Sequence, residues 1–291
     1  MVASTPAPRD TRNVGTQFRE YLTNSIVFLL LLAASILILA PFIWLLSTSL
    51  RLPRESFTLP PKWLPTDFYI QNYQTVFKTV QFGRFFLNSV FISAMVVAGQ
   101  LVTASMAAYA FARLRFPGKG LLFSILMAAL MIPIQATIIP VFIMMSKVNL
   151  SNTLWSLILP GWSSAFGVFL LRQYFLTIPN ELEDAARIDG ANSWQIYWRV
   201  MLPLCRPALA VLAILTFNGT WNEYFRPLIF LTTPDKFTLP LGLVTLRGNL
   251  GSGSVSVILA GVVLSLLPVL VLYIFTQKYL VEGITATGIK G

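Results

Sequence analysis

Residues 25–46 read SIVFLLLLAASILILAPFIWLL, a run without a single charged side chain. A helix needs roughly 20 apolar residues to cross the hydrocarbon core of a bilayer. The run is also longer than the roughly 7–15 apolar residues at the centre of a signal peptide. The small residues Ala33, Ala34 and Ser35, which could serve as a cleavage site, lie inside the run and not after it. We therefore expect a retained membrane-spanning helix here.

The composition of the whole chain agrees with this expectation. Of its 291 residues, 56% are hydrophobic and 11% are charged, whereas soluble domains carry roughly 25% charged residues. The excess of 21 Lys and Arg over 11 Asp and Glu suits loops that face anionic lipid better than a nucleic-acid surface. The absence of histidine excludes His-based catalysis and His metal ligands, and the single Cys205 excludes an intrachain disulfide. The sequence predicts an integral membrane protein without a metal site or a nucleic-acid partner.

Further apolar segments predict five more spans, which gives an all-α membrane protein with about six helices. These segments are residues 87–111, 121–145, 154–174, 204–231 and 255–279. An even number of spans places both termini on one side of the membrane. Lys and Arg gather before the first span and in the connections from the second to the third and from the fourth to the fifth. Because short cytoplasmic loops are enriched in Lys and Arg, we expect a multi-pass protein of the cell membrane with both termini cytoplasmic. Residues 1–24 then form a cytoplasmic segment and residues 25–291 the membrane domain.

Residues 52–82 form the long connection on the external side. Prolines 53, 60, 61 and 65 argue against a regular helix there. The aromatic residues Trp63, Phe68, Tyr69 and Tyr73 suit the membrane–water interface. The segment is either an interfacial loop or a docking surface for an external protein.

Prolines also interrupt the predicted spans. Pro133 and Pro140 lie in the third span, Pro160 in the fourth and Pro268 in the sixth. A proline inside a helix removes one backbone hydrogen bond and clashes with the preceding turn, and in lipid the freed groups need other partners. Kinked spans around a wet interior account for this pattern. The alternative is that prolines are simply commoner in membrane helices.

The fifth span contains the polar stretch Asn218-Gly219-Thr220-Trp221-Asn222-Glu223-Tyr224. A charged residue inside a membrane helix normally faces a partner or a cavity, and Asn218 and Asn222 share one helix face because they are four residues apart. We expect a lining for a polar solute, with candidate residues Asn218, Trp221, Asn222, Glu223 and, from the broken third span, Gln135. The alternative is that these residues join helices or cap the outer end of the span.

The connection 177–203 between the fourth and fifth spans contains IPNELEDAARIDGANSW at residues 178–194. Asn180 and Glu183 are spaced like a capping box, and Gly190 is placed to end a short helix in a left-handed conformation. Ser193 can cap a second short helix. We expect a helical knuckle on the cytoplasmic side, whose small alanines and acidic side chains suit a basic partner.

The pattern Asp184-Ala185-Ala186, Gly190, Val200 and Leu202-Pro203 resembles the EAA loop of permease subunits in binding-protein-dependent ATP-binding-cassette (ABC) importers. Two positions differ from that loop, since Asp184 replaces a glutamate and Val200 an isoleucine. The resemblance implies that the loop docks on a cytoplasmic ATPase. The residues that it assigns to docking are Glu183, Asp184, Ala185, Ala186, Asp189, Gly190, Leu202 and Pro203.

Other motifs point to the carbohydrate branch of these importers. They are Asn88-Ser89, Ala108–Arg113, Phe116–Lys119 and Trp221-Asn222-Glu223. The tail 283–291 is similar to that of the smaller permease in maltose-type systems. The resemblance implies a type I importer permease that pairs with a second permease, two ATPase subunits and an external solute-binding protein. It also implies that the C-terminal tail, about residues 280–291, reaches the ATPase interface through Thr285, Ala286, Thr287, Gly288 and Lys290.

The chain lacks the Gly-x-x-x-x-Gly-Lys-Ser/Thr motif of a nucleotide-binding loop, so ATP and Mg²⁺ must be bound by another subunit. We therefore expect a non-catalytic subunit without a cofactor. An intramembrane hydrolase would need a nucleophile with a base, and a plain membrane scaffold would leave the knuckle unexplained.

The solute itself has more than one candidate. A sugar or oligosaccharide is the leading hypothesis, and glycerol phosphate, an amino acid or a peptide is the alternative. A phosphorylated solute would require cationic side chains along the pathway, for which Arg84 and Arg226 near the outer ends of their spans are candidates.

Overall fold

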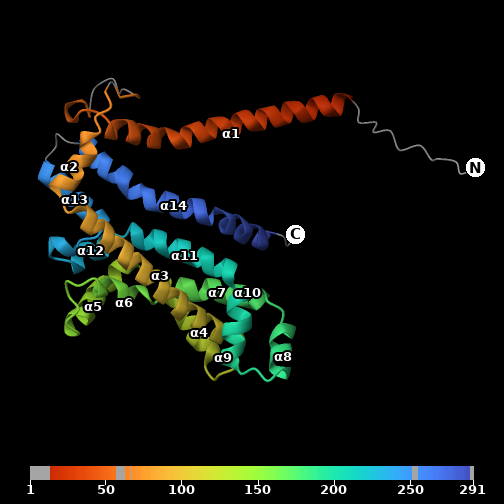
Figure 1. The fold of residues 1–291 in the computed structure, drawn as a ribbon. Helices are drawn as coiled ribbons and strands as arrows, with labels where there is room; N and C mark the ends of the chain where they lie inside the picture. The colour runs from red at the N-terminus through yellow and green to blue at the C-terminus, as the bar shows by residue number, and fades with distance from the viewer. Residues whose placement is uncertain (1–13, 57–62, 66, 251–254, 289–291) are drawn as a thin grey trace, which may run out of the picture.

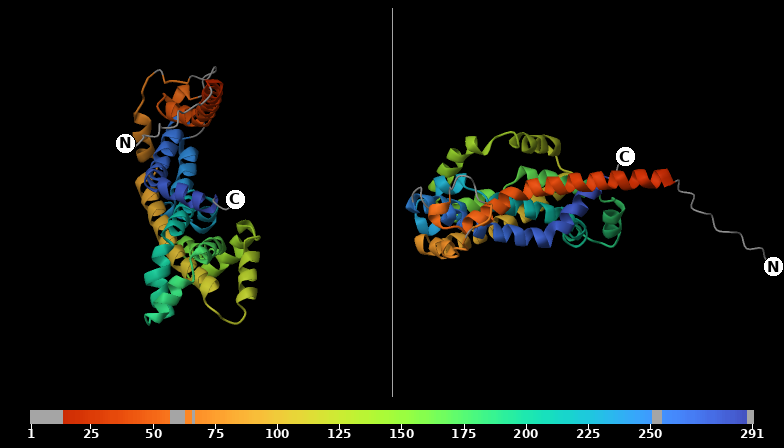
Figure 2. Two further views of the ribbon diagram at one scale, coloured as in Figure 1. Left: turned by 90° about the vertical axis from the view of Figure 1, so that its right-hand side faces the viewer. Right: turned by 90° about the horizontal axis from the view of Figure 1, so that it is seen from above.

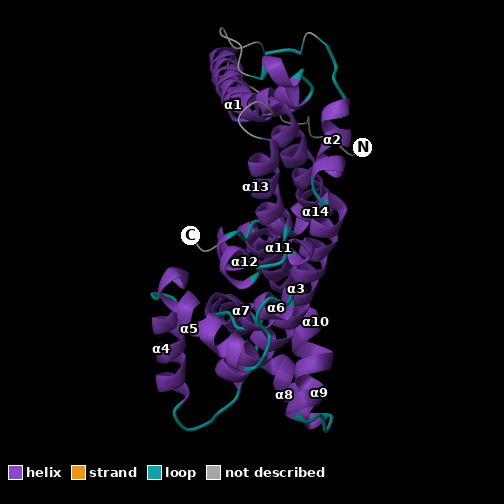
Figure 3. Cartoon of the chain, turned by 90° about the vertical axis from the view of Figure 1, so that its left-hand side faces the viewer, coloured by secondary structure: helices purple, strands orange, loops and turns teal. Residues whose placement is uncertain are grey.

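The computed structural model of the chain describes residues 14–56, 63–65, 67–250 and 255–288. Within these ranges every regular element is a helix, and Figure 3 draws only helices and loops. The prediction of an all-α fold is therefore confirmed for the part of the chain that the structure describes.

Three of the helices are continuous and apolar enough to cross a membrane. They are α1 (Val14–Ser49), α3 (Phe82–Arg113) and α14 (Val255–Gly288), with apolar segments at Tyr21–Ser49, Phe82–Arg113 and Val255–Gln277. Each contains one of the predicted spans. The apolar window of α1 has no buried residue within the chain, and α1 diverges from α14 towards its own N-terminus (Figure 1). Its apolar side chains therefore face lipid or another subunit.

The remaining predicted spans are broken, but of the interrupting prolines only Pro133 stands at a break, since Pro140, Pro160 and Pro268 lie inside helices. Residues 121–145 form α4 (Lys119–Ala129) and α5 (Ile134–Lys147), bent by 105° at a short break. Pro133 lies just before α5 and has an extended backbone conformation. Because proline has no N–H, it cannot donate the hydrogen bond that would continue α4. Within the described residues, three helices are long and apolar enough to be spans, or up to five spans if each bent pair counts as one, against the six predicted from the sequence.

The predicted span 154–174 is two short helices, α6 (Trp155–Gly161) and α7 (Ala165–Thr177). The break between them is held against α3. Because Gly99 of α3 has no side chain, the Trp162 ring lies directly on the helix, where its Nε1 donates to the Met95 carbonyl at 3.0 Å. The Ser164 hydroxyl then caps α7 by accepting from the Gly167 N–H at 3.0 Å.

The predicted span 204–231 also divides. A second bent pair, Ser193–Leu204 and Arg206–Trp221, turns by 75°. It comprises α9 (Ser193–Ile196), a π-helical turn (Tyr197–Met201), α10 (Leu202–Leu204) and α11 (Arg206–Trp221). The chain then breaks at residues 222–224 before α12 (Phe225–Phe230). The polar stretch 218–224 consequently lies at the end of a helix and not in the middle of a span.

The external segment contains more helix than the prolines suggested. After the 3₁₀ turn Pro53–Glu55, α2 forms at Gln71–Thr79, downstream of the last proline. Buried Asn72 anchors α2 to the end of α1, because its Nδ2 donates to the carbonyls of Ser49 at 2.8 Å and Arg51 at 2.7 Å. The expectation of an irregular segment is wrong for residues 71–79, while residues 57–62 and 66 lie outside the described residues.

The helices form an elongated bundle with α3 along its length (Figures 1 and 2). Helix α3 contacts α7, α11, α6 and α13 (Leu239–Leu250), whereas α14 packs on α1, α2, α11 and α13. Helix α8 (Glu181–Ile188) lies at the opposite end of the bundle from α2 (Figure 1). The end of the bundle around α2 therefore corresponds to the predicted external side of the membrane, and the end around α8 to the predicted cytoplasmic side.

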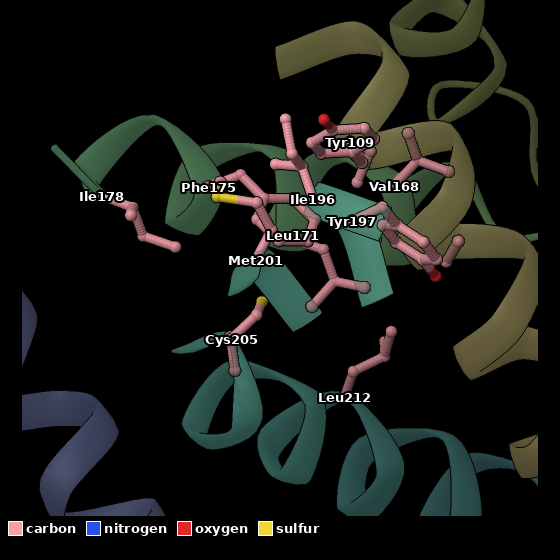
Figure 4. Close-up of a cluster of buried hydrophobic side chains, with 13 residues drawn as sticks. Tyr109, Val168, Leu171, Phe175, Ile178, Ile196, Tyr197, Met201, Cys205 and Leu212 are labelled. Atoms are coloured by element: carbon pink, nitrogen blue, oxygen red, sulfur yellow. The ribbon is translucent and has the colours of Figure 1, made fainter. Parts of the chain in front are cut away.

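A buried apolar cluster fixes the α8 end of the bundle (Figure 4). It joins Tyr109 of α3 and Phe175 of α7 to Tyr197 and Met201 of the π-helical turn, each at most 4% exposed. The Tyr197 hydroxyl also bonds the Ser105 hydroxyl at 2.7 Å. The segment after α8 is thus packed rigidly against the membrane helices.

Candidate functional site

The knuckle between α7 and α11 consists of α8 and α9 joined by a tight turn. Gly190 has a φ of +83°, in the left-handed region. The Gly190 N–H donates to the Arg187 carbonyl at 3.0 Å and the Ala191 N–H to the Ala186 carbonyl at 2.9 Å, which is the hydrogen-bond pattern of a Schellman turn. The predicted left-handed end of the first short helix is confirmed.

Both predicted N-terminal caps of the knuckle are wrong. The Asn180 side chain does not cap α8, because it accepts from the Arg113 guanidinium instead. The second helix is capped by Asn192 and not by Ser193. The Asn192 side chain accepts from the Gln195 N–H, and the Gln195 side chain accepts from the Asn192 N–H, both at 2.9 Å.

The predicted docking residues divide into an exposed and a buried set. Asp184, Ala185, Asp189 and Gly190 are exposed on the knuckle, whereas Ala186 packs against the buried cluster. Leu202 and Pro203 in α10 are half-buried. Glu183 is only 6% exposed, so it is not available on the docking face in this structure.

Exposed apolar side chains that are not among the predicted docking residues lie beside them. Ile188 is 87% exposed, Trp194 56% and Leu182 43%. Ile188 follows Asp184 by four residues and Ala185 by three, so the three share one face of α8. That spacing was visible in the sequence and could have identified Ile188. We call Leu182, Asp184, Ala185, Ile188 and Asp189 the α8 face.

Arg113, the last residue of α3, contacts the segment before α8 and the buried side of α8. Its Nη2 donates to the carbonyls of Phe175, at 2.6 Å, and Ile178, and its Nη1 to the Asn180 side chain. Its Nε lies 3.7 Å from Glu183 Oε1, and the two side chains are 6% and 7% exposed. Burial raises the pKa of Glu183, while the positive charges of Arg113 and Arg187 act in the opposite direction. The carboxylate therefore belongs to an internal network.

At the other end of the bundle, the polar stretch closes α11. Asn222 ends the helix, and its Nδ2 donates to both the carbonyl and the Oδ1 of Asn218 at 2.9 Å. Both side chains are exposed in the single chain. The predicted pairing of Asn218 and Asn222 on one helix face is confirmed.

Glu223 pairs with Arg226, three residues further on. Arg226 donates to Glu223 Oε2 from Nη2 at 3.1 Å and from Nε at 3.2 Å. The pair lines a small pocket together with Ile92, Leu157, Thr220, Pro227 and Thr238. The buried Thr238 hydroxyl has no hydrogen-bond partner in the structure. The break between α11 and α12 therefore presents several polar groups to one small space.

The other predicted pathway residues lie apart from this group. The Trp221 side chain is 2% exposed, stacks on Phe217, and donates from Nε1 to the Ser265 carbonyl at 3.1 Å. It offers no free aromatic face here, because it fills the core between α11 and α14. Gln135 is exposed in the first turn of α5.

The predicted ATPase-interface tail is described only in part. Residues 285–288 continue α14 as helix, and Lys290 lies outside the described residues. No group of three or more His, Cys, Asp and Glu that could hold a metal occurs in the described ranges.

The family profile described as "Binding-protein-dependent transport system inner membrane component" matches residues 100–285, which include the knuckle and the polar break. The chain belongs to this family. The arabinooligosaccharides transport system permease AraQ of Halalkalibacterium halodurans is 40% identical over 228 residues, covering 78% of the chain and 81% of the relative. The diacetylchitobiose uptake system permease NgcG of Streptomyces coelicolor is 30% identical, with 88% and 85% covered.

A solved structure shares the fold of this permease. It is a chain of a bacterial ABC transporter described as importing the acidic polysaccharide alginate, with a TM-score of 0.78 and 27% identity. The match covers 94% of the permease and 99% of that chain. The architecture is therefore that of an ABC importer permease, with kinked helices as expected.

Proposed function

We propose that the permease forms, with a second permease, the membrane pathway for a sugar or oligosaccharide delivered by an external solute-binding protein. Two ABC ATPase subunits, which bind ATP and Mg²⁺, drive transport from the cytoplasmic side. The permease itself has no catalytic residue and no cofactor, and both of its termini are cytoplasmic. The α8 face carries this proposal, because it is an exposed acidic and apolar surface on a short helix next to the buried cluster.

The α8 face has the composition of a docking site. Small Ala185 permits close approach, Ile188 supplies apolar area, and Asp184 and Asp189 supply charge for basic groups. Apolar side chains in the centre of an interface contribute most of the affinity, while charged groups at its rim fix orientation. The C-terminal tail, with Thr285, Ala286, Thr287, Gly288 and Lys290, is proposed as a second ATPase contact.

The choice of a sugar has two supports. Relatives along most of the chain are named as permeases for arabinooligosaccharides, diacetylchitobiose and galactooligosaccharides. In addition, Arg226 is neutralised by Glu223 at 3.1 Å and Arg84 by Asp235 at 3.3 Å. Neither arginine is a free cation for a phosphorylated solute, which disfavours glycerol phosphate. The exposed amides of Asn218 and Asn222 suit hydroxyl groups.

The test is ATP hydrolysis by the full complex in proteoliposomes with its solute-binding protein. Arabinooligosaccharides, chitobiose and galactooligosaccharides are compared with amino acids, peptides and glycerol phosphate. Stimulation by one class of saccharide is the expected result. Stimulation by an amino acid, a peptide or glycerol phosphate alone would replace the sugar with that solute, and failure of any ATPase to co-purify would reject the docking role.

A further inference from the structure

Helix α3 connects the two functional ends of the permease without a break (Figure 1). At 1.5 Å per residue its 32 residues span about 48 Å. Its last residue is Arg113, against α8, and its outer half carries Asn88, Ser89 and Ile92. It contacts α7, which precedes α8, and it contributes Ile92 to the pocket at Glu223.

At the cytoplasmic end, Arg113 binds the chain just before and within α8. It donates to the carbonyls of Phe175 and Ile178, which end α7, and to the side chain of Asn180 before α8. Its charge faces Glu183 inside α8. A single guanidinium thus ties the end of α3 to the end of α7 and the start of α8, and its planar set of donors is what makes several simultaneous bonds possible.

Arg113 and Glu183 lie close together in this structure but do not form a hydrogen bond. Arg113 Nε and Glu183 Oε1 are both buried without a hydrogen-bond partner and lie 3.7 Å apart. Buried unpaired polar atoms are unfavourable, and a shift of less than about 1 Å would bring them to hydrogen-bond distance. Movement of α8 relative to α3 therefore changes the energy of this pair directly.

At the outer end, α3 holds the segment that follows α12. Asn88 Nδ2 donates to the carbonyls of Asp235 and Phe237, both at 3.0 Å, and the Leu239 N–H donates to the Ser89 hydroxyl at 2.7 Å. This segment includes Thr238, which lines the Glu223 pocket together with Ile92 of α3. Displacement of α3 consequently moves two walls of the pocket.

We propose that Arg113 is a positioning residue that couples the docking helix to the solute pathway. Through Arg113, α3 follows the movement of α8, and through Asn88 and Ser89 it transmits that movement to the polar pocket. This inference rests on the proposed function, since it assumes that an ATPase moves α8.

The test compares three variants in the full complex. Arg113→Lys keeps the charge but cannot reach all three acceptors, and Arg113→Gln removes the charge. Arg115→Gln is the matched control, because Arg115 is an exposed arginine two residues further on. We expect solute-stimulated ATP hydrolysis to fall about tenfold in both Arg113 variants, within the usual range of coupling between sites. Basal hydrolysis and ATPase co-purification of Arg115→Gln remain unchanged, and the stimulation of each variant is expressed relative to its own basal rate.

A second measurement reports the movement of α3. A purely structural role of Arg113 would leave this movement unchanged. Gly83 lies in the first turn of α3, and a side chain added there meets open space. The native Cys205 is 0% exposed, so within this chain a maleimide reports on Gly83→Cys alone. We expect its labelling rate from outside to change when a non-hydrolysable ATP analogue binds, and this change to disappear in the Arg113→Lys background but not in the Arg115→Gln background.

The outcomes separate this inference from the proposed function. A wild-type complex without stimulation and without a change in labelling would reject the proposed function. A responsive wild type with an equally responsive Arg113→Lys variant would overturn the coupling role of Arg113. If Arg113→Gln does not assemble, the Arg113→Lys variant alone decides between these results.

Discussion

Glu183 and Asp184 are neighbours in the sequence but have opposite environments in the fold. Glu183 is turned towards Arg113 and is 6% exposed, whereas Asp184 is exposed on the α8 face. The resemblance assigned both to docking, because a sequence motif marks positions and does not show which way each side chain points. The fold divides them into one internal and one external carboxylate.

This division predicts different effects on stability. Glu183→Ala leaves the buried Arg113 charge without its acidic partner, which costs about 3 kcal/mol in similar cases. Asp184→Ala changes an exposed position, and its effect on the free energy of unfolding should stay within about 0.5 kcal/mol. The midpoint of thermal unfolding of the purified permease complex measures both. Equal midpoints for the two variants would show that Glu183 is not part of an internal network.

The exposed residues of the α8 face should instead control docking. Ile188→Asp places a charge where 87% of an apolar side chain is free to meet a partner, and Asp184→Lys reverses a charge beside it. Each should weaken ATPase binding by about 2 kcal/mol, roughly thirtyfold, as expected for a central interface residue. Co-purification and solute-stimulated ATP hydrolysis are the measurements. Asp67→Lys, at an exposed position on the predicted external segment, is the control and should leave co-purification of the ATPase unchanged.

The polar residues at the end of α11 should control uptake. Asn222→Ala removes a side-chain amide that is exposed and bonded to Asn218, and a neutral hydrogen bond is worth about 1 kcal/mol. We expect solute uptake to fall about fivefold, with an unchanged yield of assembled complex. Uptake of labelled solute into proteoliposomes is the measurement. Loss of assembly with normal uptake per assembled complex would instead support the role of these residues in joining helices.

At the scale of elements, the turn after α8 depends on one glycine. Gly190 adopts a φ of +83°, a region that costs an L-residue with a side chain about 1–2 kcal/mol. Gly190→Val should disrupt the turn and release the ATPase, whereas Gly190→Asn should retain most binding, because asparagine tolerates this conformation. Pull-down of the ATPase with each variant distinguishes them. Full binding by Gly190→Val would mean that the turn does not set the orientation of the α8 face.

The helices differ in how well the sequence predicted them. The continuous spans of α1, α3 and α14 follow from long apolar runs, and Gly190 follows from turn chemistry that is local. The positions of the breaks do not follow from proline alone, since α5 continues through Pro140 and α14 through Pro268. The break at residues 162–164 depends on the contact between Trp162 and Gly99 of α3. That contact joins residues that are distant in the sequence, so the sequence pattern does not reveal it. The same holds for the hydrogen bond from Arg113 to the Asn180 side chain, which replaces the predicted cap of α8.

At the scale of the whole molecule, function requires that the two ends of the bundle lie on opposite sides of the membrane. Helices α8 and α2 lie at opposite ends of the structure (Figure 1). Between them α3 crosses the full length, with Phe82 at one end and Arg113 at the other. The distribution of Lys and Arg in the short connections predicts that the α8 end is cytoplasmic.

Cysteine accessibility tests this topology directly. The native Cys205 is buried with 0% exposure, so the wild-type chain should react with a maleimide only after denaturation. Leu64→Cys, at a position 76% exposed, should react with a membrane-impermeant maleimide in intact cells. Ile188→Cys, in the permease expressed without its ATPase, should react only in inverted vesicles or lysed cells, because the α8 face lies at the predicted cytoplasmic end. Labelling of Ile188→Cys in intact cells would place the α8 face outside, where no ATP-hydrolysing subunit could bind it, and would remove the physical basis of the proposed coupling.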